Sequence, residues 1–110
     1  MSKSSHIEIS ELLAPDRLSD VAELFKAMGE PTRLGLMCLL LDGEQRVGDM
    51  AERLEHTPSA VSHQLRFLRG MHLVKARRDG SSIYYSLADD HVWSLVQVAY
   101  EHAEEPRRGR

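Results

Sequence analysis

The chain has 110 residues, of which 42% are apolar, and this balance excludes a disordered protein and predicts one small folded domain over residues 1–110. No apolar run approaches the roughly 18 residues that a membrane span needs, and the first residues lack the apolar core of a signal peptide. We therefore expect a cytoplasmic protein that does not contact membranes.

Positive charge is concentrated in one stretch of the chain. The formal net charge is −3, yet residues 57–85 carry a net charge of +4. The bases there are Arg66, Arg69, Lys75, Arg77 and Arg78, against the single acid Asp79. Because a phosphate backbone responds to local charge, this stretch is a candidate for DNA contact although the whole chain is acidic.

The N-terminal part of the chain predicts helices. Ile7–Leu13 is short and apolar, and a break follows it. Apolar residues at helical spacing predict a helix over residues 18–28 that stops at Gly29. Pro31 suits the first turn of the next helix, which runs through Arg33–Leu41 and is apolar on most sides. We therefore expect this helix to be central.

Two short helices follow, joined by a tight turn. The first covers Arg46–Leu54 and directs Val47, Met50, Ala51 and Leu54 inward. In the second, over about residues 57–69, Thr57 is the N-cap and Pro58 holds the first helical position. Its inward residues are Val61, Leu65 and Leu68, and Gly70 ends it.

The C-terminal part predicts a hairpin and a long helix. Leu73–Arg78 and Ser82–Leu87 are β-rich runs around an Asp79-Gly80 turn, so residues 73–87 form a wing. Residues 89–104 form a helix whose apolar side carries Val92, Leu95, Val96, Ala99 and Tyr100. The predicted fold is α+β but mostly helical, a winged helix-turn-helix.

Such a fold predicts a reading helix in the major groove of DNA and a wing beside it. We expect base contacts from the first turns of the helix, phosphate contacts from its later arginines, and backbone or minor-groove contacts from the wing. The candidates are Thr57, Ser59, Ser62, His63, Gln64, Arg66, Arg69, Lys75, Arg77 and Arg78. A second interpretation stays open, in which the same surfaces are solvated or bind protein.

Four candidate metal ligands lie at the two ends of the last helix: Asp89 and His91 near its start, His102 and Glu105 near its end. His91 and His102 are separated by about three turns and roughly 16 Å, so they share a face but cannot bind one ion. Two such helices packed antiparallel about a two-fold axis would bring Asp89 and His91 of one chain to His102 and Glu105 of the other. The spacing therefore predicts two equivalent sites in a homodimer.

The donor set favours particular metals. Two imidazoles and two carboxylates suit tetrahedral Zn²⁺, with Co²⁺ or Ni²⁺ as alternatives. Four protein ligands leave no open coordination position, which argues against catalysis. Spacing alone leaves another interpretation open, in which Asp89 or Asp90 caps the helix and the other side chains lie on a solvated surface.

Several segments resemble the ArsR/SmtB family of metal-responsive repressors. They are LFKAMGEPTRL at Leu24–Leu34, SAVSHQLRFLR at Ser59–Arg69 and YYSL at Tyr84–Leu87, and the resemblance covers roughly residues 18–105. The run His72–Arg78, followed by Asp89, His91 and His102, is especially similar to members that sense zinc or cobalt and control efflux pumps. The resemblance implies a homodimer whose first and last helices form the interface. It also implies that the metal-free protein occupies an operator and that metal releases it.

The resemblance also assigns individual residues. It places the metal site on Asp89, His91, His102 and Glu105, where the last ligand is Glu in some relatives and His in others. It implies that His63 contacts DNA. In similar sensors a ligand histidine donates a hydrogen bond to the backbone carbonyl at the position of His72, which implies an allosteric role for this residue.

Other residues extend or restrict this assignment. The family's second site uses cysteines that are missing at the matching positions, so soft metals are disfavoured. His6 could add a ligand if the N-terminal arm folds back. Cys38 lies in an apolar run and is expected to be a small buried hydrophobe.

Two rival functions stay open besides the metal-sensing repressor. One is a winged-helix regulator of a non-metal signal, such as oxidation of Cys38, and the other is a structural dimer that zinc only staples. An enzyme is not expected, because the sequence has no nucleophile–base pair, phosphate-binding glycine loop or open metal site.

Overall fold

The computed structural model describes residues 7–106 and consists of helices around one small sheet. The elements in chain order are α1 (Ile9–Leu12), α2 (Pro15–Met28), α3 (Pro31–Leu39), the 3₁₀ turn η1 (Leu40–Asp42), β1 (Gln45–Arg46), α4 (Val47–Leu54), α5 (Pro58–Gly70), β2 (Val74–Asp79), β3 (Ser82–Leu87) and α6 (Asp90–Glu104). The strands form an antiparallel sheet in the order β1-β3-β2. This is the mostly helical winged helix-turn-helix that the sequence predicts.

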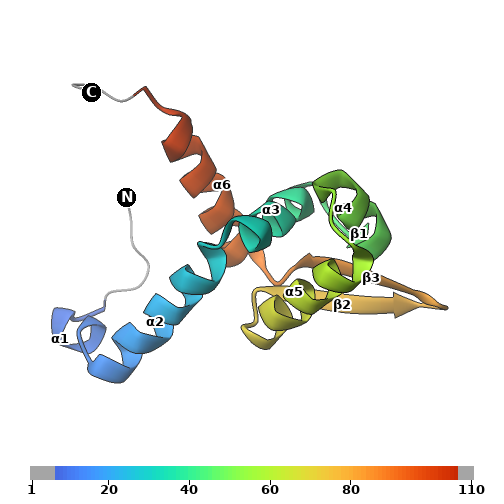
Figure 1. Ribbon diagram of the computed structural model, residues 1–110. Coiled ribbons are helices and arrows are strands. Elements are labelled where there is room, and N and C mark those ends of the chain that lie inside the picture. The colour runs from blue at the N-terminus through green and yellow to red at the C-terminus, as the bar shows by residue number, and fades with distance from the viewer. Residues whose placement is uncertain (1–6, 107–110) are drawn as a thin grey trace.

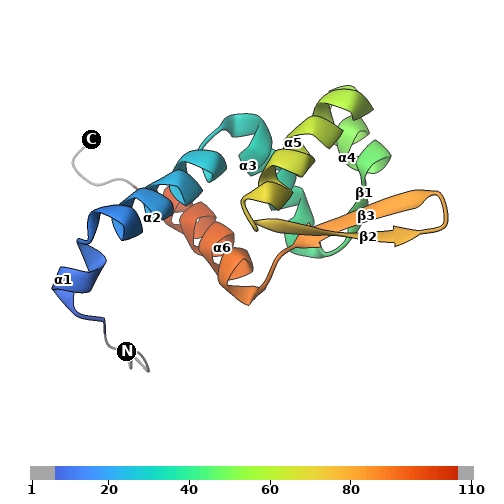
Figure 2. The same cartoon turned by 90° about the horizontal axis from the view of Figure 1, so that it is seen from below.

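Residues 31–87, from α3 to β3, form a body that we call the reading head. Figure 2 shows α3, α4 and α5 gathered beside the strands of the sheet. Apolar side chains from each of these helices and from the wing make up most of the core. The largest side chains that are fully buried are Leu36, Met37, Leu40, Met50, Leu65, Leu68, Val61 and Val96. All but Val96 belong to the head, and α2 and α6 complete the same core with Ala27, Met28, Val92 and Val96.

Side-chain caps fix where the helices begin. The hydroxyl of Thr57 accepts a hydrogen bond from the amide of Ala60 at 3.1 Å, and Pro58 holds the first position of α5. Asp89 caps α6 in the same way, accepting from the amide of Val92 at 3.0 Å. Both caps satisfy amides that the helix itself leaves without partners.

The structure corrects three element boundaries. Residues Gln45–Arg46 are a short strand paired with Tyr84–Tyr85, so α4 begins at Val47 and not at Arg46. The central α-helix ends at Leu39, two residues before its predicted end at Leu41, and continues as the 3₁₀ turn Leu40–Asp42. Asp79 pairs with Ser82, so the hairpin loop is Gly80-Ser81 and not an Asp-Gly turn, with Gly80 at φ +64°.

The helices α2 and α6 project from the head, and α1 with the outer end of α2 lies at the opposite end of the molecule from the hairpin tip (Figure 1). The predicted apolar side of α6 is only partly buried within the chain. Val92 and Val96 are buried, whereas Leu95 and Tyr100 are exposed. Within residues 7–106, no helix is long and apolar enough to cross a membrane.

Candidate DNA interface and metal centre

The exposed side of α5 carries most of the residues predicted to contact DNA. Ser59, His63, Arg66 and Arg69 are exposed, and Ser62 is half-buried. Val61, Leu65 and Leu68 face the core, as predicted. The helix therefore presents hydroxyl, imidazole and guanidinium groups on one side while the other side fixes it to the head.

Two of the predicted DNA contacts already have partners within the chain. The hydroxyl of Thr57 caps α5, and the side-chain oxygen of Gln64 accepts a hydrogen bond from Arg33 at 3.4 Å. Both residues stay candidates for DNA contact, but their side chains also hold α5 in place.

Arg33 is a structural residue that the sequence interpretation did not single out. Its Nε donates to the carbonyl oxygen of Ala27 at 2.6 Å, and its guanidinium lies 4.6 Å from the centre of the Phe67 ring. These contacts join the end of α2 to α5. An arginine near the start of an otherwise apolar central helix is the sequence signal that could have found it, because a guanidinium inside a fold needs acceptors.

The wing presents its positive charges unequally. Lys75 and Arg78 are exposed, whereas the guanidinium of Arg77 makes two hydrogen bonds of 2.8 Å with the carboxylate of Glu44. This hydrogen-bonded pair lowers the pKa of Glu44 and raises that of Arg77. Arg77 also lies 4.8 Å from the Tyr84 ring centre. Its charge is thus largely compensated within the chain, which a count of wing bases cannot detect.

The four candidate metal ligands form two separate pairs. Nδ1 of His91 lies 3.9 Å from Oδ1 of Asp89 at the start of α6, and Nδ1 of His102 lies 3.8 Å from Oε1 of Glu105 at its end. In the described part of the chain, no place brings three potential ligands together. One chain therefore offers two half-sites, each made of one imidazole and one carboxylate.

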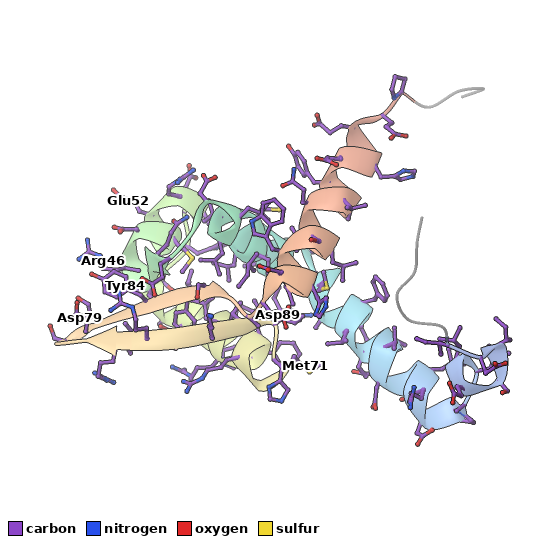
Figure 3. The ribbon with its side chains drawn as sticks, turned by 180° about the vertical axis from the view of Figure 1, so that it is seen from behind. Arg46, Glu52, Met71, Asp79, Tyr84 and Asp89 are labelled. Atoms are coloured by element: carbon purple, nitrogen blue, oxygen red, sulfur yellow. The ribbon has the colours of Figure 1, made fainter. Side chains whose placement is uncertain are left out.

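Between the two half-sites, one face of α6 is apolar and exposed. At about 100° per residue, Leu95 and Val98 fall on the same side of the helix as His91 and His102. Leu95 is 40% exposed and Val98 59% exposed. Asp89 lies where α6 leaves the head (Figure 3), and it lines a groove together with His72, His91, Leu24 and Met28. The second half-site, with His102 and Glu105, lies far along the helix.

Two remaining candidates concern the rival interpretations. Cys38 is half-buried, and burial raises the pKa of its thiol, so the reactive thiolate is disfavoured. His6, a candidate extra ligand, lies outside the described residues.

Residues 30–76 match the model of the bacterial regulatory protein arsR family. The chain is 45% identical over 95 residues to the transcriptional repressor SmtB homolog of Synechocystis sp., covering 86% of this chain and 72% of that protein. It belongs to the arsR family. It is also 40% identical to the cadmium resistance transcriptional regulatory protein CadC homolog of Staphylococcus aureus, over 84% of this chain and 78% of the relative.

A solved structure gives the same fold. The homodimeric winged helix-turn-helix DNA-binding domain Mb0332 of Mycobacterium bovis matches with a TM-score of 0.73 and 29% identity, over 98% of this chain and 100% of that one. Membership of this family of regulators implies DNA binding, and no enzyme family is indicated.

Proposed function

We propose that the chain is a homodimeric repressor that binds operator DNA without metal and releases it when Zn²⁺ binds. Co²⁺ and Ni²⁺ are the alternative effectors for the same nitrogen and oxygen donors. The observation that carries the proposal is the pair of half-sites on α6, Asp89 with His91 and His102 with Glu105, on either side of an exposed apolar face.

The proposed dimer is supported by the apolar surface that α6 leaves exposed. Leu95 and Val98 expose apolar surface that a second copy would cover, with a gain of roughly 25 cal/mol for each Å² removed from water. An antiparallel second α6 would bring its His102 and Glu105 to Asp89 and His91 of the first chain. Both ions would then be held by two chains. The homodimeric state of Mb0332 supports a dimer of this fold.

DNA binding is assigned to α5 and the wing. The exposed Ser59, His63 and Arg66 lie on the side of α5 that faces away from the core. A zinc-clamped pair of α6 helices would fix the angle between the two heads, and an angle unsuited to the operator lowers affinity. Typical allosteric coupling is about 1–3 kcal/mol, which corresponds to roughly 5- to 150-fold in affinity.

The decisive experiment is a titration of labelled DNA from upstream of the gene, with metal-free and zinc-loaded protein, by fluorescence anisotropy. Wild-type protein should bind tightly without metal and lose affinity with zinc. His102→Ala should bind the metal-free operator like wild type and fail to respond to zinc. Release of DNA by that variant at the same zinc concentration would exclude the proposed site.

The DNA contacts need a separate control. Arg66→Ala should weaken operator binding and reduce the slope of affinity against salt by about one per protomer, because one phosphate contact is lost. An unchanged slope removes Arg66 from the phosphate contacts. If zinc assembles the dimer from monomers that have no operator affinity, the protein is a stapled structural module and not a sensor.

A further inference from the structure

On the face of α6 opposite His91, a tryptophan is hydrogen-bonded to the reading head, in addition to the packing of Val92 and Val96 into the core. The indole Nε1 of Trp93 donates a hydrogen bond of 3.0 Å to the backbone carbonyl of Leu41 in η1. Two positions along a helix correspond to about 200°, so Trp93 lies across the helix axis from His91. Helix α6 therefore carries metal ligands on one side and a polar attachment to the head on the other.

The segment that accepts this hydrogen bond is itself tied to the wing. Glu44, three residues after Leu41, makes the two hydrogen bonds with Arg77 of β2. Strand β1, which follows at once, pairs with Tyr84–Tyr85 of β3. Figure 3 shows Arg46 of β1 beside Tyr84 on the sheet. One short segment is thus held by α6 at its start and by both strands of the wing at its end.

Local contacts make this segment compact. The side-chain amide of Gln45 donates to the carbonyl of Leu39, which closes the segment across its ends. Gly43 turns the chain at φ +122°, a conformation that only glycine adopts without strain. A groove lined by Leu41, Gly43, Lys75, Ser86, Asp89 and Trp93 lies where the segment, the wing and the start of α6 meet. A movement of α6 at Trp93 therefore reaches the wing through few intervening bonds.

We propose that Trp93 and Glu44 are positioning residues that transmit metal occupancy on α6 to the wing of the same chain. Zinc binding reorients the start of α6, the Trp93–Leu41 hydrogen bond moves the segment Leu41–Glu44, and the Glu44–Arg77 pair moves the hairpin. Neither residue is one of the four candidate metal ligands. The inference rests on the proposed function, because it describes how that metal response reaches the DNA-binding surface.

The test measures the coupling factor, the ratio of operator affinities without and with zinc, for the full-length dimer. Trp93→Phe keeps an aromatic ring and removes the donor. It should leave zinc affinity and metal-free operator affinity near wild type while reducing the coupling factor by roughly 2- to 10-fold, the range expected for one hydrogen bond. Tyr100→Phe is the matched control, since it removes a polar atom from an exposed aromatic on the same helix.

A second variant tests the other end of the link. Glu44→Ala should also reduce the coupling factor, whereas Glu52→Ala, which removes an exposed carboxylate from α4, should not. Loss of a nearby negative charge alone would change both operator affinities equally and leave their ratio unchanged. The coupling factor therefore distinguishes a loss of transmission from a general effect of the removed charge on DNA affinity.

Amide chemical shifts give a readout that does not depend on the variants. In wild type, zinc should shift the amide resonances of Gly43 and Arg77, and in Trp93→Phe these shifts should shrink while those of Ser94 and Leu95 persist. The proposed transmission through Trp93 and Glu44 is contradicted if zinc does not shift the amide resonances of Gly43 and Arg77 in wild type. It is also contradicted if both Trp93→Phe and Glu44→Ala keep the full coupling factor. If wild type binds zinc without any change in operator affinity, the proposed function itself fails, and the link then has no response to transmit.

Discussion

The reading head and the projecting helices treat their apolar residues in opposite ways. In the head, Leu36, Met50 and Leu65 have no exposed surface at all. On α2 and α6, by contrast, Phe25 is 57% exposed and Val98 59% exposed. The head buries its largest apolar side chains within one chain, whereas the outer helices bury only the residues nearest the head, such as Met28 and Val96, and leave the rest exposed. The apolar pattern alone does not separate these two uses, since both are helical repeats of the same kind of residue.

The largest expected effect comes from the core of the head. Leu65→Ala should lower the free energy of unfolding by about 2–5 kcal/mol, because it removes a fully buried side chain and leaves a cavity. Urea unfolding followed by circular dichroism measures this loss. A loss below about 1 kcal/mol would contradict the full burial of Leu65 in the core of the head.

The outer helices should respond to substitution in their association and not in their folding. Leu95→Glu is expected to raise the dissociation constant of the dimer by about 100-fold or more, since a buried charge without a partner costs roughly 3–5 kcal/mol. Its helical content should stay that of wild type. Sedimentation velocity over a dilution series measures the change, and a variant that stays dimeric at wild-type concentrations would remove α6 from the interface.

A smaller effect separates the two roles of Asp89. Its side chain caps α6, so Asp89→Ala should cost about 1 kcal/mol of metal-free stability, whereas Asp89→Asn, with an equally good capping residue, should cost only a few tenths. Both variants should weaken zinc binding, because the carboxylate is lost in each. Thermal unfolding and a zinc titration measure the two roles; equal stabilities for the two variants would argue against the cap.

Local sequence signals predicted most of the fold. Proline at the start of α3 and α5, the Thr57 cap and the apolar repeats of α5 locate the helix-turn-helix, because each depends only on neighbours along one helix. The strand β1 was missed because it exists only through pairing with Tyr84 and Tyr85, far along the chain. A strand of two residues is too short to show the alternation of apolar and polar side chains by which a strand is recognised in a sequence.

For the candidate site, residue spacing predicted that the four groups lie at the two ends of the last helix, and they lie there in the structure, but spacing could not describe their surroundings. The half-site pairs follow from residue spacing along one helix. The Arg77–Glu44 pair, the Trp93–Leu41 hydrogen bond and the contacts of Arg33 each join segments far apart in the chain. Such contacts depend on the tertiary fold, and propensity or spacing does not reveal them.

The central claim is that each metal ion is shared by two chains, and mixing two inactive variants tests it directly. The double variant Asp89→Ala/His91→Ala lacks one half-site, and His102→Ala/Glu105→Ala lacks the other, so neither homodimer should bind zinc tightly. In the mixed dimer one complete site reappears, formed by Asp89 and His91 of one chain and His102 and Glu105 of the other. A calorimetric titration should therefore recover one tight zinc per mixed dimer. A mixture that binds no more zinc than its separate components would contradict the shared site.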